Sequence, residues 1–223
     1  MTANTASSSS QEQQQQVRAP AVQAEETLKM ASQQLQDRPE QTQEQSSLSS
    51  PTSTTTTPAD SPLFSTTFIS PEVQAALPEG YTLRPLHRSD FYNSYLDVLR
   101  VLTTVGEVSY SGWSERYDWM KSRGGEYFPI VICDDKGKVV GTGTLLVERK
   151  FIHSLGSVGH IEDIAVDTHQ QGKRLGLRLI QALDYVAEKA GCYKTILDCS
   201  EHNEGFYIKC GFKRAGLEMA HYY

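Results

Sequence analysis

The chain has 223 residues, with 21 Lys and Arg against 27 Asp and Glu, and a net charge of −6. This acidic balance argues against a protein that coats nucleic acid, because such a protein carries a basic patch or stripe. No apolar run approaches the ~18 residues of a membrane-spanning helix, and the N-terminus lacks a basic-then-apolar signal pattern, so we expect neither a nucleic-acid nor a membrane partner.

Composition separates the chain into two parts. Residues 1–63 contain no aromatic residue and consist largely of Gln, Ser, Thr, Glu and Pro, a composition that buries too little apolar surface to fold. A transient helix over residues 24–37, where Leu28 and Leu35 are spaced i, i+7, is the alternative within this part. We predict a disordered tail over 1–63, a lead-in segment over 64–79 and one domain over 80–223, a length that supports its own core.

The first elements of the domain alternate strand and helix. Residues 81–86 predict a short strand, followed by a helix capped by Ser89 or Asp90. The apolar face of that helix would hold Phe91, Tyr95, Val98, Leu99 and Leu102, and Gly106 would end it. A second short helix is expected over residues 114–122.

The next segments predict a sheet. Residues 126–151 predict a β-hairpin around the turn residues 134–137, and residues 157–167 predict a third strand. A helix over 172–190 ends at Gly191, and it is followed by a strand over 193–199, a helix over 203–210 and a last strand over 212–223. Three antiparallel strands before a β-α-β unit indicate an α/β (α+β) fold with a mixed sheet and helices on both faces.

The cysteines give no cross-linking pattern. Cys133, Cys192, Cys199 and Cys210 show no CxxC spacing and lie in or beside apolar segments, where cysteine behaves as a small hydrophobic residue. This argues against a disulfide framework or a zinc site and favours a cytoplasmic protein. We expect Cys199 and Cys210 to be buried, so no cysteine nucleophile is assigned.

The junction between the third strand and the long helix, HQQGKRLG at residues 169–176, carries the strongest local signal. A helix N-terminus presents unpartnered N–H groups and a partial positive charge, which suit a pyrophosphate. Neither GxxxxGK[ST] nor GxGxxG is present. On spacing alone, the stretch is either an anion-binding turn or a basic surface loop.

Residues 171–176, QGKRLG, resemble the acetyl-CoA loop (R/Q)-x-x-G-x-(G/A) of the GNAT superfamily of N-acetyltransferases. Gln171 and Gly176 fit the motif, whereas Arg174 stands where the motif has its first glycine. We expect Arg174 to adopt ordinary first-turn helical geometry, which needs no glycine. The element order also matches that superfamily, and the resemblance implies a largely antiparallel central sheet with a splayed parallel strand pair.

Four further stretches resemble the glucosamine-6-phosphate N-acetyltransferases within that superfamily: VLTTVG (101–106), ERKFIH (148–153), GHIEDIAV (159–166) and residues 191–212. The resemblance covers residues 80–220. It implies acetyl transfer from acetyl-CoA to the 2-amino group of glucosamine 6-phosphate, in UDP-N-acetylglucosamine biosynthesis. It also implies direct attack in a ternary complex and a homodimer whose last strand lies near the neighbouring site.

The resemblance also assigns the acetyl-CoA site. The free backbone of the splayed strand would hold the pantetheine arm, and its N–H groups, Ile164 first, would polarise the acetyl carbonyl. The loop would give N–H groups to the pyrophosphate, and the short helix after it would line the cofactor side. The implied residues are Ile164, Ala165, Val166, Gln171, Gly172, Lys173, Arg174, Leu175, Gly176, Leu177, Asn203, Tyr207 and Lys209.

Three residues are candidates for the chemistry. The attacking amine must be neutral, and Asp198, through its carboxylate or backbone carbonyl, is the first candidate for the proton acceptor. Glu162 acting through a water is the second. The Tyr207 phenol would stabilise or protonate the leaving thiolate. We expect Phe206 and Phe212 to be core residues.

The resemblance places Glu162 and Asp163 at the amine and hydroxyls of the sugar. Because the two residues are adjacent, we expect their side chains on opposite faces of the strand.

The phosphate of the sugar needs cations or N–H donors. Tyr222 stands where the family has a basic residue, so either His221 takes that role or the phosphate relies on other cations. The implied substrate residues are Thr103, Lys150, Phe151, Ile152, His153, Glu162, Asp163, Ile164, Tyr193 and Lys194.

Two other functions stay open. One is an N-acetyltransferase for another amine, such as a protein or a polyamine, although a polyamine site would be acidic rather than basic. The other is a non-catalytic acyl-CoA-binding module, which the presence of Asp198 and Tyr207 disfavours. His160 and His169 lack metal-ligand spacing with Asp163, and direct acetyl transfer needs no metal, so none is predicted.

Overall fold

The computed structural model describes residues 60–223, and the predicted tail over residues 1–63 lies outside this range except for its last four residues. Among the described residues, no helix has both the length and the apolar character that crossing a membrane requires.

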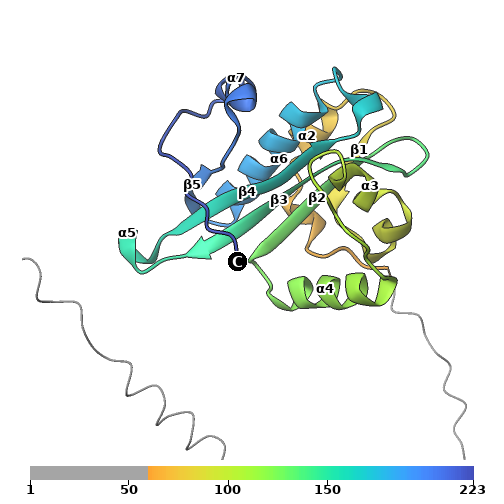
Figure 1. Cartoon of the computed structure of the whole chain (residues 1–223), viewed down its shortest axis with the longest axis horizontal. Coiled ribbons are helices and arrows are strands. Elements are labelled where there is room, and N and C mark those ends of the chain that lie inside the picture. Colours follow the sequence, from red (N-terminus) through yellow and green to blue (C-terminus); the bar gives the residue numbers. More distant parts are fainter. Residues whose placement is uncertain (1–59) are drawn as a thin grey trace, which may run out of the picture. The chain divides into compact units, whose positions relative to one another are not determined.

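Five strands form one sheet in the order β1 (Thr82–Pro85), β2 (Tyr127–Cys133), β3 (Val139–Arg149), β4 (Ser157–Val166) and β5 (Cys192–Ile196). Neighbours from β1 to β4 are antiparallel, and β5 runs parallel to β4. Figure 1 shows the long strands β3 and β4 at the centre of the sheet. The predicted mixed sheet is therefore confirmed.

Helices cover both faces of the sheet, as the sequence predicted. The alternation of β2 divides its side chains between two cores. Ile130 and Ile132 lie in the core under α6 (Leu175–Lys189), whereas Val131 and Cys133 lie in the core formed with α3 (Tyr95–Leu99) and α4 (Tyr110–Ser122). Helix α7 (Glu201–Lys209) follows β5, and the short α5 (Ile152–Leu155) lies between β3 and β4 (Figure 1).

The β2–β3 hairpin turns where the sequence predicted. The Asp134 carboxylate accepts the backbone N–H groups of Lys136, at 3.0 Å, and Lys138, at 2.9 Å. Gly137 supplies the left-handed conformation that the turn needs, with φ of 78°.

The lead-in segment packs into the domain. Leu63 is buried, and its N–H donates to the Leu86 carbonyl at 2.9 Å. The rings of Phe64 and Phe68 lie 5.0 and 5.1 Å from that of Phe128 on β2. The segment includes α2 (Pro71–Ala75), capped by Ser70. Leu63, predicted as the last residue of the tail, and the lead-in segment therefore both pack against the domain.

The continuous helix expected after residue 89 is wrong. A 3₁₀ turn, η2 (Arg88–Tyr92), and the short α3 replace it, and Ser94 between them has φ of 67°. Leu102, expected on the buried face, is 50% exposed. His87, not Ser89 or Asp90, is the N-cap, because the Asp90 carboxylate reaches back to the His87 N–H at 2.8 Å.

The strand expected over residues 212–223 is also wrong for the single chain. These residues form no helix or strand, and Leu217 and Met219 are 89% and 90% exposed. A strand needs a neighbour for its backbone groups, and none of residues 60–223 pairs with this segment.

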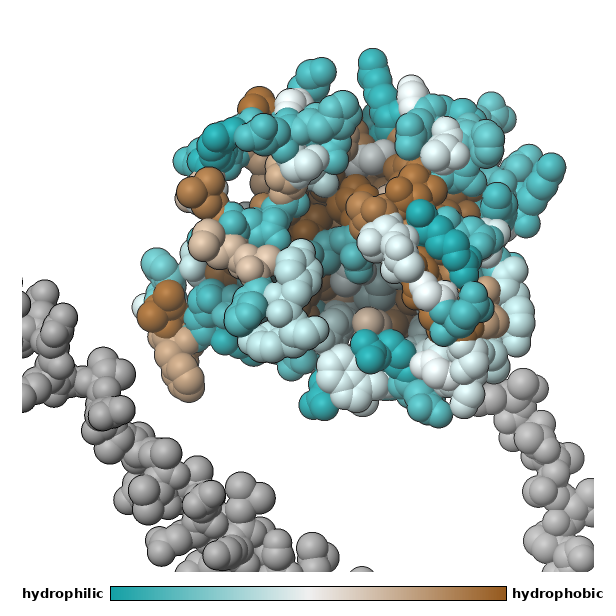
Figure 2. Space-filling model, viewed as in Figure 1, coloured by the Kyte–Doolittle hydropathy of each residue, from teal (hydrophilic) through white to brown (hydrophobic). Residues whose placement is uncertain are grey.

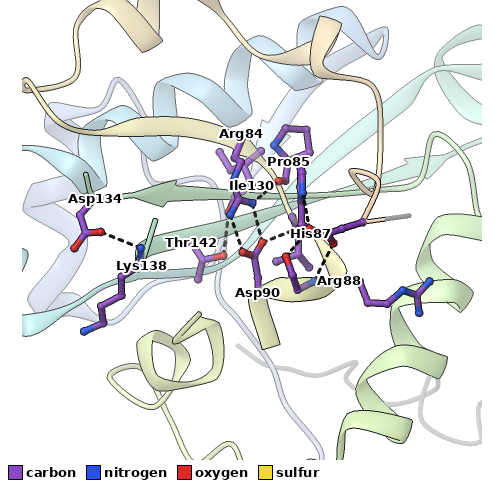
Figure 3. A network of polar contacts seen from close by, with 12 residues as sticks. Arg84, Pro85, His87, Arg88, Asp90, Ile130, Asp134, Lys138 and Thr142 are labelled. Atoms are coloured by element: carbon purple, nitrogen blue, oxygen red, sulfur yellow. Dashed lines mark hydrogen bonds and ion pairs between the residues drawn. The ribbon is translucent and has the colours of Figure 1, made fainter. Parts of the chain in front are cut away.

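A buried ion pair joins β1 to η2. Asp90 is fully buried and accepts two hydrogen bonds from the Arg84 guanidinium, at 2.7 and 2.8 Å, in addition to the His87 N–H. Figure 3 shows the pair beside Thr142 of β3, whose hydroxyl donates to the Ile130 carbonyl at 3.0 Å. The bidentate geometry satisfies both carboxylate oxygens.

Asp90→Asn should lower the free energy of unfolding by about 3 kcal/mol, because the largely buried Arg84 charge would lose its partner. Urea denaturation of the full chain measures this. Asp97→Asn is the matched control, since Asp97 pairs with Arg100 at 2.6 Å on the surface and should cost less than about 1 kcal/mol. Equal losses in the two variants would contradict the importance of the buried pair.

Candidate active site

The pairing between β4 and β5 covers only the first part of β4. Their pairing ends with His160 opposite Ile196, while β4 continues to Val166. Within the described part of the chain, no strand pairs with the β5-facing edge of residues 161–166, so their backbone groups on that side are open to a ligand. The splayed parallel pair implied by the resemblance is confirmed.

A β-bulge changes the direction of β4 at this point. Ala165 pairs with Thr142 and Glu162 pairs with Thr144, so Asp163 and Ile164 together face Gly143. Asp163 has φ of 54°. Gly143 leaves room for the Ile164 side chain here, because a Cβ at residue 143 would force Ile164 Cδ1 to move. The bulge therefore interrupts the alternation of β4 after Glu162, at Asp163 and Ile164. That the side chains of Glu162 and Asp163 lie on opposite faces stays a prediction.

A cavity of about 610 Å³ lies between the end of β4, the start of α6 and helix α7. Figure 2 shows this face of the domain hollowed near its middle, with hydrophobic residues inside and hydrophilic residues around the hollow. The cavity includes eleven of the expected cofactor residues: Ile164, Val166, Gln171, Gly172, Arg174, Leu175, Gly176, Leu177, Asn203, Tyr207 and Lys209.

Two expected cofactor residues do not line the cavity. Ala165 is buried in the core formed with α3 and α4. The Lys173 ammonium is bonded to the Tyr81 hydroxyl, at 2.8 Å, and to Gln170 Oε1, at 2.6 Å. A contribution from Lys173 to a ligand in the cavity would therefore come from its backbone.

The N-terminus of α6 is suited to an anion. None of the described side chains caps it, in contrast to α4, where the Ser109 hydroxyl accepts the Gly112 N–H. Its first residues line the cavity, so the positive end of the helix is available there. Arg174 is the N-cap with φ of 63°, so the expectation of helical geometry at Arg174 is wrong.

Helix α7 forms the opposite wall and adds residues that the sequence analysis missed. Phe206 was expected in the core but is 36% exposed and lines the cavity. Cys210 also lines the cavity. Phe212 packs against the core under α6, as expected. The signal was present, since Asn203, Phe206, Tyr207 and Cys210 share one helical face. Gly176 lets Phe206 approach α6, because a Cβ there would lie 3.3 Å from Phe206 Cζ.

Burial and neighbouring charge adjust two titratable groups of the site. Burial raises the pKa of the Tyr207 phenol, which keeps it protonated at neutral pH. Partial desolvation raises the pKa of the Glu162 carboxyl although its side chain stays exposed, and the charges of Asp163, Asp198 and Glu218 act in the same direction. Asp198 is exposed just after β5.

The two cysteines flanking α7 differ from expectation. Cys199 is exposed rather than buried, because it lies in the short connection before the helix. Cys210 is half-buried at the helix end, and this burial raises the pKa of its thiol.

The expected phosphate ligands lie at the other end of β4. His153 packs on the Tyr193 ring with 4.7 Å between centroids, and the Lys194 ammonium lies 5.8 Å from that ring. Lys150 pairs with Glu148 at 2.6 Å. At ~3.3 Å per residue, the start of β4 is roughly 20 Å from Ile164, and Figure 1 shows α5 beyond that start.

Other expected substrate residues are also apart from the cavity. Phe151 and Ile152 are 94% and 62% exposed on the β3–β4 connection. Thr103 lines a second hollow of about 390 Å³, formed by residues 100 and 103–107. His221 and Tyr222 lie in the exposed C-terminal segment.

Comparison with known proteins agrees with this geometry. Residues 86–212 match the acetyltransferase (GNAT) family. The chain is 52% identical to the glucosamine 6-phosphate N-acetyltransferase of Candida albicans, over 64% of this chain and 96% of that protein. It is 44% identical to glucosamine 6-phosphate N-acetyltransferase 1 of Dictyostelium discoideum, over 65% and 92%.

A solved structure shows the same architecture. The crystal structure of glucosamine-6-phosphate N-acetyltransferase from Arabidopsis thaliana superposes with a TM-score of 0.63 at 36% identity. The match covers 65% of this chain and 99% of that one.

Arg174→Gly should raise the free energy of unfolding by up to about 1 kcal/mol. A side chain in the left-handed region costs about 1–2 kcal/mol, which outweighs the greater freedom of glycine in the unfolded chain. Urea denaturation measures this. Arg174→Ala, which keeps a Cβ at φ of 63°, is the control and should bring no gain. A loss above 1 kcal/mol in Arg174→Gly would show that the arginine side chain stabilises the loop.

Proposed function

The chain belongs to the acetyltransferase (GNAT) family, and we propose that it transfers the acetyl group of acetyl-CoA to the 2-amino group of glucosamine 6-phosphate. The products are N-acetylglucosamine 6-phosphate and CoA, on the route to UDP-N-acetylglucosamine. The observation that carries this proposal is the 52% identity across 96% of the Candida albicans enzyme. The family match over residues 86–212 includes every residue that lines the cavity.

The residues around the cavity fit acetyl-CoA. The uncapped start of α6, at Leu175, Gly176 and Leu177, would donate N–H groups to the pyrophosphate. The open edge of β4 at Ile164 and Val166 would pair with the amides of the pantetheine arm as an added strand does. The apolar side chains of α7 would cover that arm.

The acidic group beside the splay would prepare the amine. The ammonium form of the sugar must lose a proton before its nitrogen can bond to the acetyl carbon. A carboxylate with a raised pKa is a better proton acceptor near neutral pH, and the pKa of the Glu162 carboxyl is raised, so we assign this role to Glu162. The Asp198 carboxylate would attract the positively charged ammonium form of the sugar. The N–H of Ile164 would stabilise the negative charge that develops on the acetyl oxygen.

Tyr207 would complete the transfer. The carbon–sulfur bond breaks as the amide forms, and the thiolate takes a proton from the phenol, whose raised pKa keeps that proton available. The attacking nitrogen loses two protons in total. One replaces the proton that Tyr207 gave to the thiolate, and the other leaves through Glu162, so one proton appears in solution for each acetyl group transferred from the ammonium form of the sugar.

A homodimer would complete the substrate site. The Lys150, His153 and Lys194 cluster lies too far from the cavity for one sugar phosphate to reach both within a single chain. Phe151, Leu155, Leu217 and Met219 are 72–94% exposed, which supports burial against a second copy. Sedimentation of the full chain at one chain mass would contradict this assembly.

Release of CoA thiol tests the function. Mixing the full chain with acetyl-CoA and glucosamine 6-phosphate should release thiol, whereas glucosamine, spermidine or a lysine peptide should give at least about a hundredfold lower kcat/KM, since a lost charged contact costs several kcal/mol. Turnover with spermidine or peptide instead would favour the other amine acetyltransferases. Acetyl-CoA binding without turnover of any amine would favour the non-catalytic module.

Tyr207→Phe should lower kcat about tenfold or more while changing the KM for both substrates less than about twofold, because the hydroxyl acts on charge that develops in the reaction. Steady-state kinetics measures this, with Tyr127→Phe on β2 as the control. An unchanged kcat would leave Tyr207 as a packing residue.

A further inference from the structure

Two hydrogen bonds of the Tyr81 hydroxyl join the residue before β1 to the loop before α6. Its hydroxyl donates to Gln170 Oε1 at 2.6 Å, and the Lys173 ammonium donates to the same hydroxyl at 2.8 Å. Lys173 also donates to Gln170 Oε1 at 2.6 Å, which closes a triangle of three groups. The Lys173 ammonium lies 5.5 Å from the centre of the Tyr81 ring.

Tyr81 is itself fixed from behind by the lead-in segment. Gln74 of α2 donates its amide to the Tyr81 carbonyl at 3.2 Å, and its Oε1 accepts the Leu83 N–H at 2.6 Å. The Tyr81 side chain packs against the core that contains α6. The triangle therefore joins the loop at Gln170 and Lys173 to Tyr81, which is about 90 residues earlier in the chain and is held by α2 and the core.

The loop needs such an anchor because its backbone is strained. Gly172 and Arg174, on either side of Lys173, have φ of 79° and 63°. A left-handed non-glycine residue costs about 1–3 kcal/mol and persists where its surroundings fix it. Arg174 is the N-cap of α6, so its conformation aims the first N–H groups of the helix at the cavity.

We propose that Tyr81 is a positioning residue for the pyrophosphate end of the acetyl-CoA site. It holds Lys173 and Gln170, and through them the strained loop, in the conformation that presents the α6 N-terminus. In this arrangement the Lys173 charge serves to fix the loop and not to bind the pyrophosphate. This inference rests on the proposed function, because it assumes that acetyl-CoA occupies the cavity.

Tyr81→Phe removes two contacts of the triangle and keeps the ring. In the full chain it should raise the Kd for CoA, measured by calorimetry, and the KM for acetyl-CoA about three- to tenfold. The kcat and the KM for glucosamine 6-phosphate should change less than about twofold. Lys173→Met should give the same result, and the double variant should be no weaker than the poorer single variant, because both changes open one triangle.

Two matched controls isolate the triangle from general effects. Tyr185→Phe on the surface of α6 tests the loss of a phenol, and Lys136→Met in the β2–β3 turn tests the loss of a positive charge. Neither should change the Kd for CoA. Lys173→Arg, which keeps a long donor near Tyr81 and Gln170, should lie closer to the parent chain than Lys173→Met.

Several outcomes would overturn the proposal. If Lys173→Met weakens CoA binding and Tyr81→Phe does not, the lysine contacts the anion directly. If the double variant raises the Kd for CoA by the product of the two single effects, the two residues act independently and the triangle does not position the loop. An equal rise in the KM for acetyl-CoA and the KM for glucosamine 6-phosphate would also contradict the proposal, because the loop should affect only acetyl-CoA. If the parent chain binds no CoA, the proposed function is overturned as well. If the parent chain binds CoA and Tyr81→Phe leaves the Kd for CoA unchanged, only this inference is overturned.

Discussion

The site depends on the early end of one parallel strand pairing. β4 and β5 share four residue pairs and then part, although β4 continues for six residues more. A backbone N–H or carbonyl left unpaired away from water is costly, so this edge is stable only if water or a ligand satisfies it. Beyond Ile196, where β5 ends, β4 borders a cavity whose opposite wall is α7.

The two walls of the cavity, α6 and α7, offer different chemical groups to a ligand. The α6 wall offers uncapped N–H groups and a positive helix end, whereas the α7 wall offers Phe206 and the phenol of Tyr207. The acidic residues Glu162 and Asp198 stand where the strands part. A ligand with an anionic end and an apolar arm that bears amides would therefore meet groups of complementary kind in this cavity.

The regular spacing of apolar residues in the sequence predicted most of the strands and helices. Irregularities of the backbone at single residues could not be predicted from that spacing. Period-two and helical spacing predicted the hairpin, β4 and α6, because burial on one face leaves that mark in the sequence. The break at Ser94, the bulge at Asp163 and the left-handed Arg174 are departures at single residues, where tertiary contacts override local preference. The family motif predicted the loop residues that line the cavity, but neither the Tyr81 contacts nor the position of Phe206.

The missing last strand has a different origin. Residues 212–223 carry a strand-like pattern, yet none of residues 60–223 pairs with them, including the edge strand β5. Lys150 and His153, the predicted phosphate ligands, lie near one end of β4, whereas the residues proposed for acyl transfer lie towards the other. Both the C-terminal segment and this basic end of β4 lie beside exposed apolar residues. A second copy that supplied a strand partner would bury those residues and could bring its own basic cluster to the cavity, so recognition of the phosphate and transfer of the acetyl group would be tasks of different chains.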